Sequence, residues 1–324
     1  MRYFDITSFP EMAEGIRRPY HEKYFAMYSS VYGGIVTDPV LMMVPVDDHM
    51  VHRGDGIFEA FECINGKIYN MKAHMDRLER SASMLYHKLP GALEDISRTV
   101  IETVRAGGRK NCSIRLFVSR GPGSLDANPN DCPDSQLYVV VTSLDKPFME
   151  RHPEGARVRT SAIPAKSPFF ARVKSCNYLP NVLMKKEAFD LGVDFVVTFD
   201  EKGFLLESAT ANMGVGTKEK ALLFPKLDGI LRGTTMMRVV ELAEKLIESG
   251  DLVETGFADI SKDAVLNAAE LLITGTTVNV TAVKEFDGRP VGNGRPGPVY
   301  EKLSVFLLDD MLHNSDLQTP VFDS

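Results

Sequence analysis

The sequence has few cysteines, no long apolar run and no long basic segment. Its four cysteines form no CxxC pair and no His/Cys cluster with zinc spacing, so we expect reduced thiols and no structural metal. No apolar run approaches the roughly 20 residues needed to span a bilayer. The first residues also lack the charged and apolar parts of a signal peptide. We therefore expect a cytoplasmic protein that does not enter a membrane.

The charge of the chain excludes one class of partner. A net charge of -7 without a basic run makes nucleic acid an unsuitable ligand, although a local positive site for a small anion is compatible with it. With 324 residues, 44% of them apolar, the chain is long enough for two domains with substantial cores. A cleft between two domains is the natural place for a small ligand.

The order of the expected elements indicates an α+β fold. Strand clusters and helix clusters do not alternate strictly, which argues against a doubly wound parallel sheet. We predict an N-terminal extension (1–35), a small N-terminal domain (36–145), a linker rich in turn signals (146–156) and a large C-terminal domain (157–324).

Hydrophobic periodicity predicts the individual elements. In the small domain, a strand is expected at Leu41 to Val46 and another at Ile57 to Ile64, closed by the hairpin signal Asn65-Gly66. A helix is expected through Met71, Met75, Leu78, Ala82 and Leu85, and a second one from Leu93 to Ala106. The other expected strands are 114–119, 137–142, 158–163, 195–199, 204–206, 212–216, 221–224 and 271–274, and the other expected helices are 181–191 and 234–248.

Lys174 is the first candidate for chemistry, because it lies on a predicted turn just before an amphipathic helix. A lysine amine titrates near pH ~10.4, so it needs desolvation or a neighbouring cation, such as Arg172, to react as a nucleophile. The simplest alternative is an ordinary solvated lysine.

Three features of the sequence could hold an anion. Gly233-Thr234-Thr235 stands at a predicted helix start, where backbone N–H groups and the helix dipole favour negative charge. Thr274-Gly275-Thr276-Thr277 is a second hydroxyl-rich turn. Arg77 could bind a phosphate with two parallel hydrogen bonds. Each has a plain alternative: a helix cap, a common loop, and a surface arginine paired with Asp76 or Glu79.

Glu207 follows the apolar strand Phe204-Leu205-Leu206. A carboxylate at the end of a buried strand is costly unless a cation accompanies it, and a protonated pyridine nitrogen would be such a partner. An exposed glutamate at a strand end is the alternative.

Six ordered motifs together resemble the class IV (fold-type IV) pyridoxal-phosphate aminotransferases. They cover about residues 28 to 305, and their order is far more specific than any one of them. The motifs are His52-Arg53-Gly54-Asp55-Gly56-Ile57-Phe58-Glu59; His74-x-x-Arg77-Leu78-x-x-Ser81-Ala82; Lys174-Ser-Cys-Asn-Tyr-Leu-Pro-Asn-Val-Leu with Glu187-Ala188; Glu207-x5-Met213; Ile230-Leu231-Arg232-Gly233-Thr234-Thr235; and Thr274-Gly275-Thr276-Thr277.

The resemblance implies a two-domain enzyme with pyridoxal 5'-phosphate in the cleft, working as a homodimer. It implies that Lys174 forms the internal aldimine and shuttles a proton, that Glu207 pairs with the pyridine nitrogen, and that Tyr178 lies near the phenolic oxygen. It further implies that the phosphate is held by a set drawn from three motifs, namely Arg77, Thr234, Thr235, Gly275 and Thr276.

The substrate is less constrained. The Arg-x-His pair of bacterial D-amino acid aminotransferases is replaced here by Leu125-Asp126-Ala127, so we expect Arg53 and Arg115 to bind the α-carboxylate instead. Either arginine could alternatively pair with Glu59 or Asp55. The region around Met27 to Arg53 resembles the plant D-amino acid aminotransferase-like branch.

We therefore expect amino transfer between a D-amino acid, such as D-alanine or D-glutamate, and a 2-oxo acid. Branched-chain L-amino acid transamination is the first alternative. Aminodeoxychorismate lyase is disfavoured by Glu59-Ala60, where several lyases have a threonine. A catalytically silent protein of the same fold is disfavoured by the intact Lys174 and Glu207.

Overall fold

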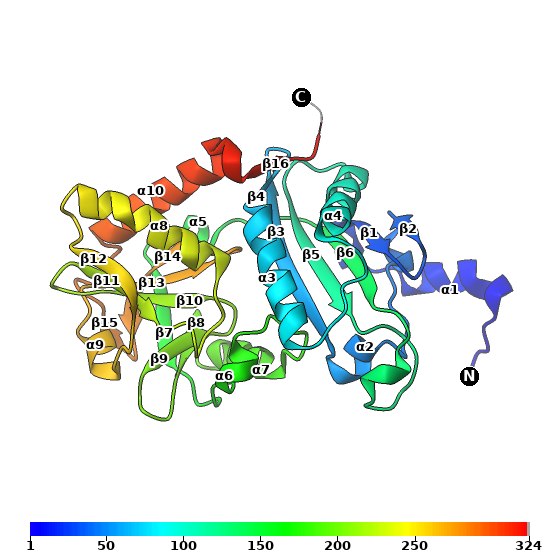
Figure 1. Ribbon diagram of the computed structural model, residues 1–324, viewed down its shortest axis with the longest axis horizontal. Coiled ribbons are helices and arrows are strands. Elements are labelled where there is room, and N and C mark those ends of the chain that lie inside the picture. Colours follow the sequence, from blue (N-terminus) through cyan, green and yellow to red (C-terminus); the bar gives the residue numbers. More distant parts are fainter. Residues whose placement is uncertain (323–324) are drawn as a thin grey trace. The chain divides into compact units, whose positions relative to one another are not determined.

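The computed structural model describes residues 1–322 and divides into two compact units, each with its own sheet (Figure 1). Unit 1 comprises Met1–Asp145, Ser175–Asn177 and the C-terminal residues from Leu317, and unit 2 comprises Lys146–Lys174 and Tyr178–Asp316. The division at residue 146 coincides with the expected start of the linker. The expected extension 1–35, however, supplies a strand and part of a second strand to the sheet of unit 1.

Unit 1 is built on a seven-stranded sheet in the order β16-β4-β3-β5-β6-β1-β2, with antiparallel pairing throughout. Its strands are β1 Tyr24–Ser29, β2 Gly34–Val36, β3 Gly56–Ile64, β4 Lys67–Tyr69, β5 Cys112–Ser119, β6 Gln136–Thr142 and β16 Gln318–Pro320. β3 and β4 are joined by Asn65-Gly66, both with positive φ, as a two-residue hairpin turn requires. The predicted hairpin is therefore confirmed.

Two long helices pack on this sheet. α3 (Met71–Met84) packs on β3, and α4 (Leu93–Gly107) packs on β1, β5 and β6 (Figure 1). The predicted apolar stripe of α3 is buried, and α4 ends at Gly108 in the left-handed conformation that glycine adopts without steric cost. The other helices of the unit are α1 Phe9–Ile16, α2 His49–Arg53 and 3-10 turns at Ile6–Ser8, Pro19–Lys23, Pro39–Leu41 and Pro129–Asp131.

The strand predicted at Leu41 to Val46 is wrong. The chain forms a 3-10 turn at Pro39–Leu41 and then runs without regular structure to α2. Pro39 and Pro45 have no backbone N–H to donate to a ladder, and Val46 is exposed, so the apolar run does not join the sheet.

Unit 2 contains a nine-stranded mixed sheet. β12-β11-β10-β13-β14-β7-β8-β9 are neighbours in that order, β15 pairs with β14, and β9 also pairs with β10, so that six strands close into a ring. The strands are β7 Ala156–Thr160, β8 Phe195–Phe199, β9 Leu205–Ser208, β10 Asn212–Gly216, β11 Ala221–Pro225, β12 Glu254–Ala258, β13 Glu270–Gly275, β14 Asn279–Phe286 and β15 Arg289–Pro290. The mixture of mostly antiparallel sheets and packed helices confirms the α+β class.

The core of unit 2 is formed by apolar side chains of these strands, including the fully buried Met213, Val197 and Ile273. α8 and α10 lie side by side against the sheet (Figure 1), and α8 matches its predicted bounds. The expected linker contains α5, whose Phe148 is buried in this core. The helices are α5 Phe148–Arg151, α6 Pro168–Ala171, α7 Leu179–Asp190, α8 Thr234–Glu248, α9 Lys262–Leu266 and α10 Pro298–His313, followed by a 3-10 turn at Ser315–Leu317.

Candidate functional site

Three neighbouring strands of unit 2 bring polar residues into one row. Glu207 on β9 is the register partner of Asn212 on β10, and Asn212 is in turn the partner of Thr274 on β13. Asn212 and Thr274 are buried, and the side chain of Glu207 is 13% exposed. The antiparallel register therefore places the candidate carboxylate beside one of the two hydroxyl-rich turns.

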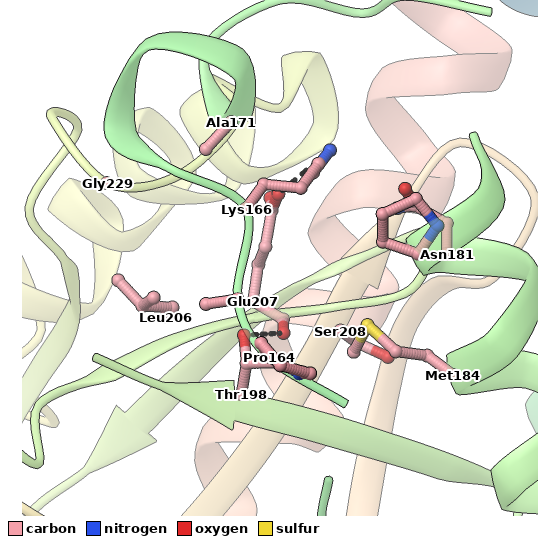
Figure 2. A pocket seen from close by; sticks show the side chains of 12 residues that line it. Pro164, Lys166, Ala171, Asn181, Met184, Thr198, Leu206, Glu207, Ser208 and Gly229 are labelled. Atoms are coloured by element: carbon pink, nitrogen blue, oxygen red, sulfur yellow. Dashed lines mark hydrogen bonds and ion pairs between the residues drawn. The ribbon is translucent and has the colours of Figure 1, made fainter. Parts of the chain in front are cut away.

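The carboxylate of Glu207 is fixed by donors on one oxygen. Its Oε2 accepts hydrogen bonds from the backbone N–H of Leu231 at 3.0 Å and from Asn212 Nδ2 at 3.3 Å. Its Oε1 lies 4.0 Å from the ammonium nitrogen of Lys166, as Figure 2 shows. Hydrogen bonds to the charged form favour ionisation, so this arrangement suits a carboxylate that pairs with a cation. The strand-end position predicted from the sequence is thus partly buried and not freely solvated.

The first turn of α8 is the best anion site in unit 2. Thr234 and Thr235 are buried at its start, and the N-cap residue Gly233 makes no side-chain hydrogen bond to the helix. The first N–H groups of a helix have no acceptor within it, and the positive end of the helix dipole lies there, so the position favours an anion. A Cβ at Gly233 would lie 2.0 Å from Asn212 Oδ1, so only glycine lets the helix start approach the row of Glu207 and Asn212 so closely.

The second hydroxyl-rich turn links β13 to β14. Gly275 ends β13 and pairs with Asn279, and Thr276 lies in the tight turn between them. A Cβ at Gly275 would lie 3.4 Å from the carbonyl oxygen of Thr210, in the segment that joins β9 to β10. The structure therefore brings Gly275 and Thr276 near the β9–β10 connection that follows Glu207.

Lys174 lies in the irregular segment between α6 and α7, and it is half-buried. Tyr178 is the N-cap residue of α7. Its hydroxyl donates to the carbonyl oxygen of Ala209 at 3.3 Å, and Asn181 Nδ2 donates to the same oxygen at 2.5 Å. These bonds tie the start of α7 to the connection between β9 and β10, two residues beyond Glu207.

Several buried polar atoms of this region have no hydrogen-bond partner among residues 1–322. They are Asn181 Oδ1, Ser208 Oγ and Thr274 Oγ1. Buried polar groups are normally satisfied by protein, water or ligand. Together with the carboxylate of Glu207 and the start of α8, they fit a ligand that combines a ring cation with a phosphate, as pyridoxal 5'-phosphate does.

Arg77 lies in unit 1, on the buried side of α3. Its Nε and Nη2 donate to the two carboxylate oxygens of Glu59 at 2.8 and 2.7 Å, and His74 Nδ1 lies 2.7 Å from the same carboxylate. The alternative of a surface arginine is wrong, because Arg77 is buried. Burial would raise the pKa of the Glu59 carboxyl, but the charge and hydrogen bonds of Arg77, with those of His74, lower it to about 2. The phosphate role of Arg77 stays a prediction.

Arg53 and Arg115 also belong to unit 1, but their backbones lie far apart. Arg115 pairs with Ala60 on β3, whereas Arg53 precedes Gly56, which is four residues, or about 13 Å, further along the same strand. Arg53 donates to the carbonyl oxygens of His52 and Leu125, and Arg115 donates to Ser113 Oγ. The two carboxylates considered as alternatives have other arginine partners, since Glu59 binds Arg77 and Asp55 binds Arg120.

Arg115 has the half-buried environment predicted from strand alternation. Ile114, Leu116 and Val118 are buried on the opposite face of β5, as expected, and Phe117 shares the face of Arg115. Glu62 is buried on the neighbouring strand. Burial raises the pKa of its carboxyl to about 7, and the charge of Arg115 opposes that rise.

Sequence reasoning missed three polar residues of the site: Asn181, Asn212 and Lys166. Asn212 could have been found from its position, because an asparagine inside an apolar strand pattern needs a hydrogen-bonding reason to be buried. Lys166 carried no such signal. Within residues 1–322, no group of three or more His, Cys, Asp or Glu side chains is placed to hold a metal, and no helix is long and apolar enough to cross a bilayer.

The comparisons with known proteins identify the family. The sequence model of the family Amino-transferase class IV matches residues 56–286. D-amino-acid transaminase, chloroplastic, from Arabidopsis thaliana is 39% identical over 90% of this chain and 77% of its own length. A putative branched-chain-amino-acid aminotransferase from Methanocaldococcus jannaschii is 32% identical over 82% of this chain and 90% of its own.

A solved structure shares the fold. A bacterial-type branched-chain amino acid aminotransferase crystallised with pyridoxamine 5'-phosphate superposes with a TM-score of 0.84 at 26% identity, over 93% of this chain and 99% of the other. The family match spans well over half of the chain, and its residues include Lys174, Glu207 and the two hydroxyl-rich turns. The chain therefore belongs to the class IV aminotransferases and is a pyridoxal-phosphate-dependent enzyme.

Proposed function

We propose that this aminotransferase acts on D-amino acids, such as D-alanine or D-glutamate, with a 2-oxo acid as the amino acceptor. The observation that carries this proposal is the 39% identity, over 90% of the chain, to a protein named D-amino-acid transaminase. A relative named D-alanine aminotransferase from Bacillus licheniformis is 28% identical over 83% of the chain. Branched-chain L-amino acid transamination is the second candidate, favoured by the likeness to the crystallised branched-chain enzyme.

The roles proposed for unit 2 follow from its contacts. The cofactor, when bound, supplies an aldehyde that takes up the amino group and a ring that withdraws electrons. Glu207, held at Oε2 by Asn212 and Leu231, is suited to keep the ring nitrogen protonated. The first turn of α8 and the turn at Gly275-Thr276 are suited to bind the phosphate, with Arg77 of unit 1 as a further candidate.

Lys174 is the proposed base and acid. Its amine, once released by an incoming amino group, removes the proton from the substrate Cα and returns it to the cofactor carbon. Tyr178 is proposed to lie near the phenolic oxygen of the cofactor. Its hydroxyl is already oriented by the carbonyl oxygen of Ala209, next to the strand that carries Glu207.

For the α-carboxylate of the substrate we propose Arg115 and Arg53. Arg115 is half-buried and donates to Ser113, so its guanidinium is partly desolvated, whereas Arg53 is exposed beside Gly54. The separation of about 13 Å between their strand positions means that Arg53 has to reorient to share a carboxylate with Arg115. Arg115→Leu should raise KM for amino acids and 2-oxo acids by at least tenfold and leave a carboxylate-free amine nearly unaffected.

The matched control is Arg98→Leu, because Arg98 is exposed on α4 and pairs with the exposed Asp95. It should change neither KM. If Arg115→Leu affects amino acids and the carboxylate-free amine equally, the carboxylate role of Arg115 is lost.

A half-reaction panel tests the choice of substrate. The absorbance of the lysine-bound cofactor is followed after mixing with D- and L-alanine, D- and L-glutamate, L-leucine, a chiral primary amine and aminodeoxychorismate. The D-amino acids should convert the cofactor at least tenfold faster than their L-forms. Faster conversion by L-leucine would support the branched-chain alternative, pyruvate release from aminodeoxychorismate the lyase, and no conversion at all a silent protein.

We also propose a homodimer located in the cytoplasm. α6 and α7 expose large apolar side chains, among them Phe170 (51% exposed), Leu179 (64%) and Val182 (56%), which a second copy could cover. The four cysteines are free thiols, as expected for a reducing compartment. Light scattering coupled to size exclusion should give twice the chain mass of 35.9 kDa, and a single-chain mass would contradict the dimer.

A further inference from the structure

Lys166 is a second lysine amine in the region of Glu207, and none of the roles proposed above uses it. It lies in the segment between β7 and α6, and its side chain is only 19% exposed. Its Nζ is 4.0 Å from Glu207 Oε1 and 5.9 Å from the centre of the Tyr178 ring (Figure 2). The ammonium is therefore placed near both residues that we propose to flank the cofactor ring.

The contact between Lys166 and Glu207 is electrostatic and loose. At 4.0 Å it exceeds the length of about 2.7–3.2 Å of a good hydrogen bond, whereas Glu207 Oε2 has two hydrogen-bond donors. The ammonium thus stabilises the ionised carboxylate without being fixed to it. A second cation that reaches the same carboxylate would repel the ammonium.

The surroundings of Lys166 give the ammonium room to move. A small cavity of about 20 Å³ lies on the Glu207 side, lined also by Asn181, and has room for about one water. A cavity of about 790 Å³ is lined by Lys166 as well, and its walls include the carboxylates of Glu201 and Asp228. Rotation of the flexible lysine side chain between these two spaces would change its counter-ion from Glu207 to an exposed acidic group.

We propose that Lys166 is a positioning residue that serves as the place-holding cation of Glu207 while the cofactor is absent. The inference rests on the proposed pairing of Glu207 with the ring nitrogen. In the cofactor-free protein, Lys166 keeps the partly buried carboxylate ionised and oriented. When the ring cation binds, the ammonium leaves Glu207, so the favourable contact between the two side chains exists only in the cofactor-free state.

This exchange makes the contribution of Lys166 opposite in the two states. An interaction that stabilises only the cofactor-free protein weakens cofactor binding by the same factor, because binding must break it. For a pair that is about 19% exposed on the lysine side, a three- to tenfold effect on Kd is expected.

The test uses purified cofactor-free protein and 4'-deoxypyridoxine 5'-phosphate, which has the ring and the phosphate but no aldehyde to react with a lysine. Lys166→Met removes the charge and keeps much of the length, Lys166→Arg keeps the charge, and Glu207→Gln removes the partner. Lys166→Met should bind the analogue three- to tenfold more tightly than the wild type, and Lys166→Arg should bind it within twofold. In the Glu207→Gln background, Lys166→Met should change Kd by less than twofold.

Thermal unfolding supplies a second readout. Without ligand, Lys166→Met should melt below the wild type, and saturating analogue should remove most of that difference. Lys166→Gln replaces Lys166→Met if the methionine variant does not fold.

The two proposals fail separately. If Glu207→Gln weakens analogue binding but Lys166→Met leaves it unchanged or weaker, Glu207 keeps its role and the place-holding role of Lys166 is contradicted. If Glu207→Gln has no effect on analogue binding, Glu207 is not the partner of the ring, and the inference about Lys166 falls with it.

Discussion

At the scale of single residues, Glu59 is the buried anion on which the inner side of α3 depends. It is completely buried, and its carboxylate binds Arg77 through two hydrogen bonds and His74 through a third contact. Breaking one partner of a buried ion pair is strongly destabilising, because the remaining charge loses its compensation. The same pair orients the side chain of Arg77, the predicted phosphate ligand of unit 1.

We therefore expect Glu59→Gln to lower the free energy of unfolding by about 3 kcal/mol. Glu79→Gln, at an exposed position of the same helix, should change it by less than about 0.5 kcal/mol. Urea denaturation followed by circular dichroism measures both. Equal stability of the two variants would show that the buried pair contributes nothing.

Glu62 should give the protein a dependence on pH of the opposite kind. Burial raises the pKa of its carboxyl from 4.5 to about 7, so between these values the unfolded chain releases a proton that the folded chain retains. Folding stability from this group is thus greatest below pH 4.5 and is lost as pH rises towards 7. The full loss is about 3 kcal/mol at most, since each unit of pKa corresponds to about 1.4 kcal/mol.

Glu62→Gln should remove this slope and stabilise the protein above pH 7, where the wild type holds a buried charge. Unfolding free energies at pH 5 and pH 8 check this, with Glu102→Gln on the exposed side of α4 as the control. A Glu62→Gln variant with an unchanged difference between the two pH values would contradict the raised pKa.

At the scale of elements, the site in unit 2 depends on the close approach of the α8 start to β10. Gly233 allows this approach, because a Cβ there would lie 2.0 Å from Asn212 Oδ1. Asn212 in turn bonds Glu207 Oε2 and the carbonyl oxygen of Leu231. A displaced helix start would therefore disturb the anion site and the carboxylate together.

Gly233→Ala should reduce cofactor affinity by at least tenfold while the fold persists. The fraction of cofactor retained after gel filtration, read from its absorbance, is the measurement. Gly256→Ala is the control, since a Cβ at Gly256 in β12 meets no atom within 4 Å. Full retention by Gly233→Ala would mean that the start of α8 does not hold the phosphate.

At the scale of the whole molecule, periodic elements were predictable and conformations that depend on distant contacts were not. α8, β8 and β10 have their predicted bounds because their apolar patterns are packed as the pattern requires. The apolar run at Leu41 to Val46 also has such a pattern, but its prolines cannot donate to a ladder and it stays outside the sheet. α10 and β14 were missed altogether.

The candidate site follows the same rule. Ordered motifs predicted the family, because Lys174, Glu207 and the two turns carry its chemistry at recognisable spacing. Asn212 and Lys166 could not be placed, because strand register and the path of the segment at residues 164–168 decide which side chains reach Glu207. Arg77 was predicted as a surface group or a ligand, and its buried bond to Glu59 depends on the packing of α3 on β3.

The central claim is that Lys174, and no other amine of the site, carries the cofactor. Borohydride reduction of the holoprotein followed by peptide mass spectrometry tests this directly, because it fixes the cofactor to the lysine that holds it. The label should be found on Lys174 alone and should disappear in Lys174→Ala. A label on the neighbouring amine Lys166, or no covalent label in protein that contains the cofactor, would contradict the account.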